Sequence, residues 1–194
     1  MTKARLHPAL LEFWGAMGDM VFKKRGNKIY VSMKPKKGTK KASKAQLARR
    51  KVFRKAVYYA KTAMANEATR AFYKAIAAEK DREARPLCVA DYLNAPTIEE
   101  LDVSKYQGNV GDRILIMTYD DVGVVKVNVT LTNRDGMTIE TGRAVEQGVG
   151  SGNWKYTATV SVPPGSGICI EAEAYDRPAN RAIVSTNFTV GVKK

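Results

Sequence analysis

The stretch VVKVNVTLTNRDGMTIETGRAV, residues 124–145, alternates apolar and polar side chains on both sides of a short polar turn. The apolar positions of its first arm are Val125, Val127, Val129 and Leu131. A period of two is typical of a β-strand with one buried face. Asn133–Gly136 (NRDG) has the composition of a hairpin turn, since Asn, Asp and Gly tolerate the backbone angles that such turns need. We therefore predict two consecutive antiparallel strands here.

Similar segments, rich in Val, Ile, Thr and Tyr, recur about every ten residues through the C-terminal half of the chain. Turns containing Gly, Asn, Asp or Pro separate them. We predict seven strands: Thr97–Val103, Arg113–Tyr119, Val124–Thr132, Met137–Val145, Trp154–Val162, Ile168–Tyr175 and Ala182–Val190. Seven short strands in about 100 residues are typical of an antiparallel β-sandwich.

The N-terminal half has a different pattern. Strand-like segments flank Arg25-Gly26-Asn27, which predicts a β-hairpin. A polar linker containing Pro35 and Gly38 follows. Three helices are then expected: about residues 44–65 after a Ser43 cap, about residues 67–80 after an Asn66 cap, and a short one with Pro86 in its first turn. The fold class is thus α+β, with a basic hairpin-helical domain at 1–95 and a β-sandwich domain at 96–194.

Positive charge is concentrated in the first of these domains. Of the 194 residues, 1–95 hold 23 Lys and Arg against 7 Asp and Glu, whereas 96–194 hold 10 against 12. The first 95 residues therefore carry a net charge of +16 and the remainder a net charge of −2, within a total of +14. Such asymmetry favours a half that binds polyanions or assembles with neighbours.

The charge is densest from Lys23 to Lys55, which contains fifteen Lys and Arg and no acid. A basic ribbon, linker and helix face can follow a phosphate backbone, with Tyr30, Tyr58 or Tyr59 available to stack on unpaired bases. The predicted nucleic-acid-binding residues are Lys23, Lys24, Arg25, Lys28, Lys34, Lys36, Lys37, Lys40, Lys41, Lys44, Arg49, Arg50, Lys51, Arg54 and Lys55. The alternatives are contacts with acidic protein neighbours in an assembly and a solvated face. Because zinc-ligand spacing, RNP motifs and basic zippers are missing from the sequence, we expect little sequence specificity.

Other candidate sites are weaker. Asp120 and Asp121, with Asp112 or Asp176, could gather at one end of the sandwich around a calcium ion, but turn capping is the commoner role of such residues. We therefore expect no metal and no cofactor. The single histidine, His7, lies near the terminus, and Cys88 lies among apolar residues as a structural thiol would. We expect no catalytic residues and no enzymatic activity.

Two resemblances concern the whole layout. The phrases at residues 119–127 (YDDVGVVKV), 154–156 (WKY) and 174–180 (AYDRPAN) resemble those of bacterial immunoglobulin-like domains. The resemblance implies an immunoglobulin-like sandwich from about Pro96 to Val192. The whole chain also resembles a set of uncharacterised bacterial proteins with a basic N-terminal ribbon-helix module before such a domain, a likeness carried by Gln46, Arg50, Phe53, Tyr59, Ala60 and residues 91–96 (DYLNAP). That set implies no particular activity.

From these observations we expect a non-enzymatic protein that binds nucleic acid through phosphate contacts, with DNA favoured over RNA, while its sandwich contacts other proteins. The alternative is a structural subunit of a phage-like particle or filament that forms a homo-oligomer through its basic arm. Neither hypothesis involves a small-molecule substrate. Neither involves a membrane, because no apolar run approaches the roughly 20 residues of a membrane span. The expected location is the cytoplasm or the interior of such a particle.

Overall fold

The computed structural model describes residues 2–3, 15–25, 28–36 and 41–191. Within them the protein is α+β, with three helices and several antiparallel sheets. The chain divides into two compact units, Met1–Lys44 and Ala45–Lys194. This division differs from the change of composition between residues 95 and 96, and hydrogen bonds join the second and third helices to loops between the β-strands that follow them.

The first unit contains a four-stranded antiparallel sheet with the order β1-β4-β3-β2. Its strands are β1 (Thr2–Lys3), β2 (Gly15–Met17), β3 (Met20–Arg25) and β4 (Lys28–Met33). β3 and β4 pair along their whole length, and Ile29 at the middle of the sheet is buried. The expected turn residues Gly26 and Asn27 lie outside the described residues.

The second unit begins with three helices: α1 (Lys44–Ala65), α2 (Glu67–Glu79) and α3 (Ala84–Leu93). Asn66 caps α2 as predicted, since its side-chain oxygen accepts a hydrogen bond from the Thr69 backbone N–H. The small core of this group contains buried residues from all three helices: Ala60, Ala63, Tyr73 and Cys88.

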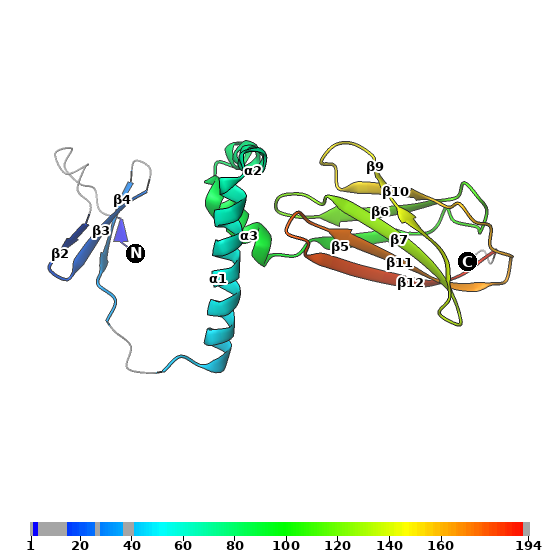
Figure 1. The fold of residues 1–194 in the computed structure, drawn as a ribbon, viewed down its shortest axis with the longest axis horizontal. Coiled ribbons are helices and arrows are strands. Elements are labelled where there is room, and N and C mark those ends of the chain that lie inside the picture. The colour runs from blue at the N-terminus through cyan, green and yellow to red at the C-terminus, as the bar shows by residue number, and fades with distance from the viewer. Residues whose placement is uncertain (1, 4–14, 26–27, 37–40, 192–194) are drawn as a thin grey trace. The chain divides into compact units, whose positions relative to one another are not determined.

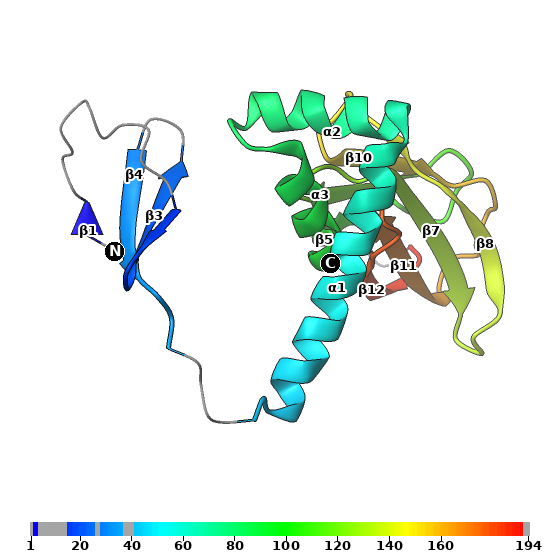
Figure 2. The same cartoon turned by 60° about the vertical axis from the view of Figure 1, so that its left-hand side comes forward.

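α2 and α3 cover only the C-terminal half of α1. Ala56, Ala60 and Ala63 are buried, whereas every residue from 44 to 55 is exposed. Phe53, which the periodicity assigns to the apolar face, has 53% of its surface exposed. Figure 2 shows the reason: α2 and α3 lie beside the end of α1 that leads into α2, and the first half of α1 runs beyond them.

Eight strands follow the helices and form two four-stranded antiparallel sheets (Figure 1). One sheet has the order β5-β6-β10-β9, with β5 (Thr97–Asp102), β6 (Arg113–Tyr119), β10 (Asn153–Thr157) and β9 (Val145–Glu146). The other has the order β12-β11-β7-β8, with β12 (Arg181–Thr189), β11 (Gly167–Tyr175), β7 (Lys126–Asn133) and β8 (Thr138–Arg143).

The count of eight differs from the expected seven because the segment 137–145 is not one strand. It breaks at Ala144, which is buried and donates its backbone N–H to the carbonyl of Val127. Before the break, β8 pairs with β7; after it, the two residues of β9 pair with β10 in the other sheet. The chain therefore crosses between sheets at this alanine.

A single apolar core lies between the two sheets. Alternate residues of β7 and β11 point into it, which confirms the period-two reading of both segments. Val125 is the exception, because it lies before β7 and is 41% exposed. Trp154 and Tyr156 of β10 fill the opposite side, as expected for sheet-face aromatics. The turn after β7 also follows the prediction, because the Asn133 side chain accepts the backbone N–H groups of Asp135 and Met137, and Gly136 has a φ of 78°.

Candidate functional site

The predicted basic residues of the first unit lie on β3, on β4 and in the segment after them. Lys23, Lys24 and Lys28 are exposed, and in the ladder Lys23 lies opposite Tyr30 and Lys24 opposite Ile29. Arg25 is the last residue of β3 and pairs with Lys28. Lys34, Lys36 and Lys41 are exposed, whereas Lys37 and Lys40 lie outside the described residues.

The predicted basic residues of α1 form a coherent surface along one helix. Helical spacing places Lys44, Lys51 and Lys55 close together on one side of α1, with Arg50 and Arg54 next to them. This side is opposite the face that buries Ala56 and Ala60. Arg49 projects from the core-facing side, but at a level where no core lies beneath it, so it too is exposed.

These side chains have no acidic partners. Among the residues that the structure describes, the one salt bridge joins Arg181 to Glu173, both in the sandwich. The first half of α1 also contains no acidic residue that could balance it. Within the described part of the chain, the exposed stretch Lys44–Lys55 is therefore a cationic surface whose basic side chains form no salt bridge, which we call the α1 basic surface.

A second arrangement of charged residues lies where the helices meet the sandwich. Asp91 of α3, Asp120 of the β6–β7 loop and Asp176 of the β11–β12 loop each offer a carboxylate oxygen, and these three oxygens lie within 4.8 Å of one another. Asp91 is completely buried and Asp176 is 2% exposed. We call these three residues the aspartate cluster.

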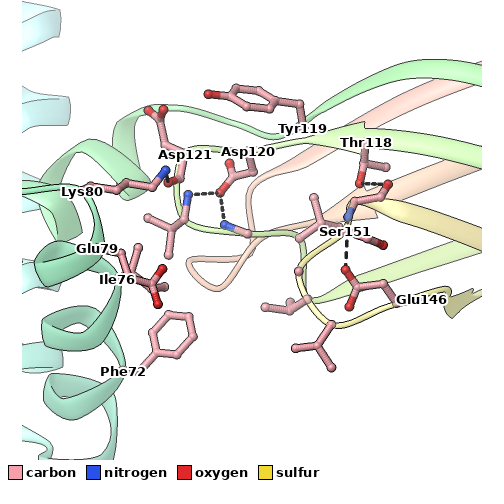
Figure 3. A pocket seen from close by; sticks show the side chains of 17 residues that line it. Phe72, Ile76, Glu79, Lys80, Thr118, Tyr119, Asp120, Asp121, Glu146 and Ser151 are labelled. Carbon is pink, nitrogen blue, oxygen red and sulfur yellow. Dashed lines mark hydrogen bonds between the residues drawn. The ribbon is translucent and has the colours of Figure 1, made fainter.

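Local hydrogen bonds hold each carboxylate of the aspartate cluster in place. Asp120 Oδ2 accepts the backbone N–H groups of Val122 (2.8 Å) and Gly123 (2.7 Å), which tightens the loop after β6 (Figure 3). Asp176 accepts both the backbone N–H (2.6 Å) and the side-chain amide (2.7 Å) of Asn180. Loop geometry thus fixes two members of the cluster independently of the helices.

The third member is fixed by tyrosines. Tyr73 of α2 donates its hydroxyl hydrogen to Asp91 Oδ2, and the Tyr59 hydroxyl of α1 lies 3.1 Å from that of Tyr73. Asp91 Oδ1 has no hydrogen-bond partner among the described residues. Burial, together with the nearby charges of Asp120 and Asp176, raises the pKa of Asp91 to about 7. Burial also raises the pKa of Asp176.

The Asn180 side chain ties the cluster to the end of α3. Its amide nitrogen lies 3.2 to 3.3 Å from the backbone carbonyl oxygens of Asp91, Tyr92 and Asn94, in addition to its bond to Asp176. An amide group has only two hydrogens to donate, so these four oxygens outnumber the protons offered to them. The junction therefore has more oxygen acceptors than donors.

A cavity of about 590 Å³ opens beside the cluster. Figure 3 shows Phe72 and Ile76 of α2 on one side of it and Asp120 on the other. Lys80 at the end of α2 donates to the backbone carbonyl of Asp121 at 2.6 Å, which fixes this helix against the loop. Of the aspartate cluster, Asp120 lines this cavity, whereas Asp91 and Asp176 do not.

Sequence reasoning found part of this junction and missed its central residue. Asp120 and Asp176 were expected to gather at one end of the sandwich, and they do; Asp112 instead caps the loop at Gln107 and Asn109, and Asp121 accepts from Asn94. Asp91 was recognised only as part of the segment before the sandwich. A signal existed, because Asp91 lies four residues after Leu87 and so falls on the buried face of a short helix.

The remaining predictions for single residues can be stated briefly. Cys88 is buried and burial raises the pKa of its thiol, as expected for a structural cysteine, and it forms no disulfide with Cys169. His7 lies outside the described residues. Of the helices in the described part of the chain, none is both long and apolar enough to cross a membrane.

Comparisons with known proteins add a distant structural likeness. No protein-family model matches the chain, and no curated protein matches it. One solved structure that it resembles is CopC from Methylosinus trichosporium OB3b, with 12% sequence identity and a TM-score of 0.38. The alignment covers 49% of this chain and 92% of that one.

Proposed function

We propose that the protein is a non-enzymatic nucleic-acid-binding protein that contacts the phosphate backbone with little sequence specificity. The observation that carries this proposal is the α1 basic surface, which is exposed, cationic and without acidic partners in the described structure. A surface of this kind attracts a polyanion because each phosphate contact releases condensed counterions. The basic residues on β3 and β4 are proposed as a second set of contacts.

The proposed contacts carry no means of reading bases. Lysine and arginine side chains that reach phosphates position a protein on nucleic acid but do not distinguish sequences. Tyr58 is 73% exposed on the same side of α1 as Lys51 and Lys55, and it could stack on an unpaired base. We favour DNA over RNA as the partner.

The test is a salt titration with matched charge variants. Protein purified with nuclease and high salt is titrated into fluorescent duplex DNA, single-stranded DNA and RNA between 50 and 200 mM NaCl, and anisotropy reports binding. The variant Lys51→Glu/Arg54→Glu/Lys55→Glu removes three proposed contacts. We expect the slope of log K against log salt to become shallower by up to about 2.7, because each phosphate contact contributes about 0.9.

The control variant changes the net charge by the same amount at another place. Arg70→Glu/Lys74→Glu/Arg82→Glu alters three exposed basic residues on or next to α2. Under the proposal, the control changes the slope much less than the α1 variant. Equal effects of the two triple variants would show that net charge alone drives binding, and absence of binding at 50 mM NaCl would exclude the proposed function.

The alternative function is that of a structural assembly subunit, as in a phage-like particle or filament. It is favoured by the exposed apolar residues Val52 and Phe53, which continue the core-facing side of α1 beyond the helical core. Apolar side chains in this position suit a neighbouring subunit better than a phosphate backbone.

Light scattering in nuclease-treated, high-salt solution separates the two functions. Under the alternative, the protein forms oligomers without nucleic acid, and Phe53→Ser or removal of residues 1–42 abolishes them. Under the first proposal, the protein is monomeric in these conditions and Phe53→Ser leaves DNA binding within about twofold.

We also propose that the sandwich is immunoglobulin-like and serves protein contacts. Support comes from the strand order, because β5, β6 and β10 share one sheet while β7, β11 and β12 share the other, as the corresponding strands of immunoglobulin domains do. On the residues quoted above, we further propose membership of the bacterial proteins with a basic ribbon-helix module. A place in the cytoplasm, or within a phage-like particle, is part of the same proposal.

A further inference from the structure

We propose that the aspartate cluster binds a divalent cation, Ca²⁺ in the first instance, and that this ion joins the helices to the sandwich. The three ligand residues would be Asp91, Asp120 and Asp176, which come from α3 and from two loops at the same end of the sandwich. This inference does not depend on the proposed nucleic-acid binding.

The spacing of the carboxylates fits the ion. Ca²⁺ binds oxygen ligands at 2.3–2.6 Å, so two ligands of one ion are at most about 5 Å apart. The three oxygens of the cluster lie within 4.8 Å of one another, inside that limit for every pair. Mg²⁺ binds at 2.0–2.1 Å in near-ideal octahedral geometry and usually keeps several waters, so a site whose ligands come from three protein side chains favours Ca²⁺.

An unpartnered oxygen gives independent support. Asp91 is completely buried, and its Oδ1 accepts no hydrogen bond from the described residues although Tyr73 serves Oδ2. A buried carboxylate oxygen without a partner is costly, and a cation supplies the missing interaction. The carbonyl oxygens at the end of α3 that share the Asn180 amide add oxygen donors of the type that Ca²⁺ accepts.

The negative charge of the three carboxylates also favours a bound cation. Like charges this close cannot all be ionised without a counterion. The nearby cation, Arg177, has its guanidinium 4.0 Å from the centre of the Phe72 ring and makes no salt bridge to the cluster. A divalent ion would balance the carboxylates, and the cavity reaches one of the three proposed ligands, Asp120.

The experiment uses the full-length protein, freed of metal with EDTA and then dialysed. CaCl₂, and separately MgCl₂, is titrated by isothermal calorimetry, and Tb³⁺ is added as a luminescent probe that tyrosines such as Tyr59 and Tyr73 can sensitise. We expect one saturable Ca²⁺ site with a Kd between about 10 µM and 1 mM, from the weak limit of sensor sites to that of extracellular sites. At a hundredfold excess over Kd, Ca²⁺ should raise Tm by about 5 °C or more.

Asp112 offers a matched control for Asp120. Each aspartate accepts two backbone N–H groups through Oδ2, at 2.7 Å in both bonds of Asp112 and at 2.7 and 2.8 Å in Asp120, but Asp112 is outside the cluster. The change to Asn removes one charge and keeps an acceptor oxygen in each loop. We expect Asp120→Asn to weaken Ca²⁺ binding at least tenfold and Asp112→Asn to leave it within twofold.

Several results would overturn the inference. Wild-type protein that shows neither heat of binding nor a Tm shift with Ca²⁺ would do so without any variant. Equal losses in Asp120→Asn and Asp112→Asn would show that binding is not at the cluster. Because Asp120→Asn could unfold its loop, circular dichroism is recorded for both variants, and Asp176→Asn, with the same expected loss, serves as a second test.

Discussion

Two buried tyrosines in the sandwich core should respond in opposite ways to loss of their hydroxyl groups. Tyr106 is 1% exposed, and its hydroxyl has no hydrogen-bond partner in the described structure. Tyr156 is 3% exposed, and its hydroxyl donates to Glu140 Oε2 at 3.1 Å. The changes Tyr106→Phe and Tyr156→Phe each remove one oxygen atom from the same core.

The expected changes in the free energy of unfolding follow from the hydrogen-bond partners of the two hydroxyl groups. An unpaired buried hydroxyl costs about 1–3 kcal/mol, and the small void left by its removal costs about 0.5–1 kcal/mol, so Tyr106→Phe should leave stability unchanged or raise it by up to about 2 kcal/mol. Tyr156→Phe removes a hydrogen bond to a buried carboxyl side chain and leaves Glu140 with only the two Thr159 donors. The expected loss is about 1.5–3 kcal/mol.

Urea unfolding at pH 7, followed by tryptophan fluorescence, to which Trp14 and Trp154 both contribute, measures both variants. The free energy of unfolding should differ between them by about 1.5–5 kcal/mol, with the m-value unchanged if both retain the wild-type fold. The reasoning would be refuted if Tyr106→Phe lost as much stability as Tyr156→Phe, since volume would then matter and hydrogen bonding would not.

Three further predictions concern the backbone and the ionisation of the core. Gly152→Ala should lose about 2–4 kcal/mol in urea unfolding, because Gly152 has a φ of 70° and an added Cβ would overlap the Thr118 carbonyl oxygen; unchanged stability would contradict this geometry. Asn66→Ala should lose about 1 kcal/mol by removing the α2 cap, whereas Asn66→Asp, which keeps the acceptor, should lose less than about 0.5 kcal/mol. Burial raises the pKa of Tyr156 to about 12 from 10.0, so its neutral form stabilises the fold fully below pH 10, and about 2–3 kcal/mol should be lost as pH rises from 10 to 12. Tyr156→Phe should flatten that decline, and an equal decline in the variant would show that other groups cause it.

Local patterns in the sequence predicted the elements well. The bounds of α1, the Asn66 cap of α2 and the turn at Asn133 each depend on residues within one or two turns of chain, and the structure has all three. The break at Ala144 was not predictable in the same way, because an apolar residue fits a continuous strand as well as a crossing between sheets. Which sheet each side joins depends on partners far away in sequence.

The junction shows the same limit more clearly. Asp91, Asp120 and Asp176 are separated by 29 and 56 residues. The turns that follow two predicted strands placed Asp120 and Asp176 at one end of the sandwich, but nothing local to Asp91 indicates that it meets them. Phe53 is the opposite case, since its helical spacing predicts burial but α2 and α3 are too short to cover its part of α1. The meeting of the three aspartates and the exposure of Phe53 both depend on where other helices and strands begin and end.

The uncovered half of α1 has a consequence for thermodynamics. Its twelve residues, about 18 Å long, place like charges four positions apart, as in Lys51 and Lys55, and that repulsion favours the coil. A polyanion that neutralises those charges would relieve this repulsion and stabilise the exposed half of the helix as it docks. Any fraying of this exposed half should therefore decrease on binding, and far-ultraviolet ellipticity should become more negative along the same isotherm as binding.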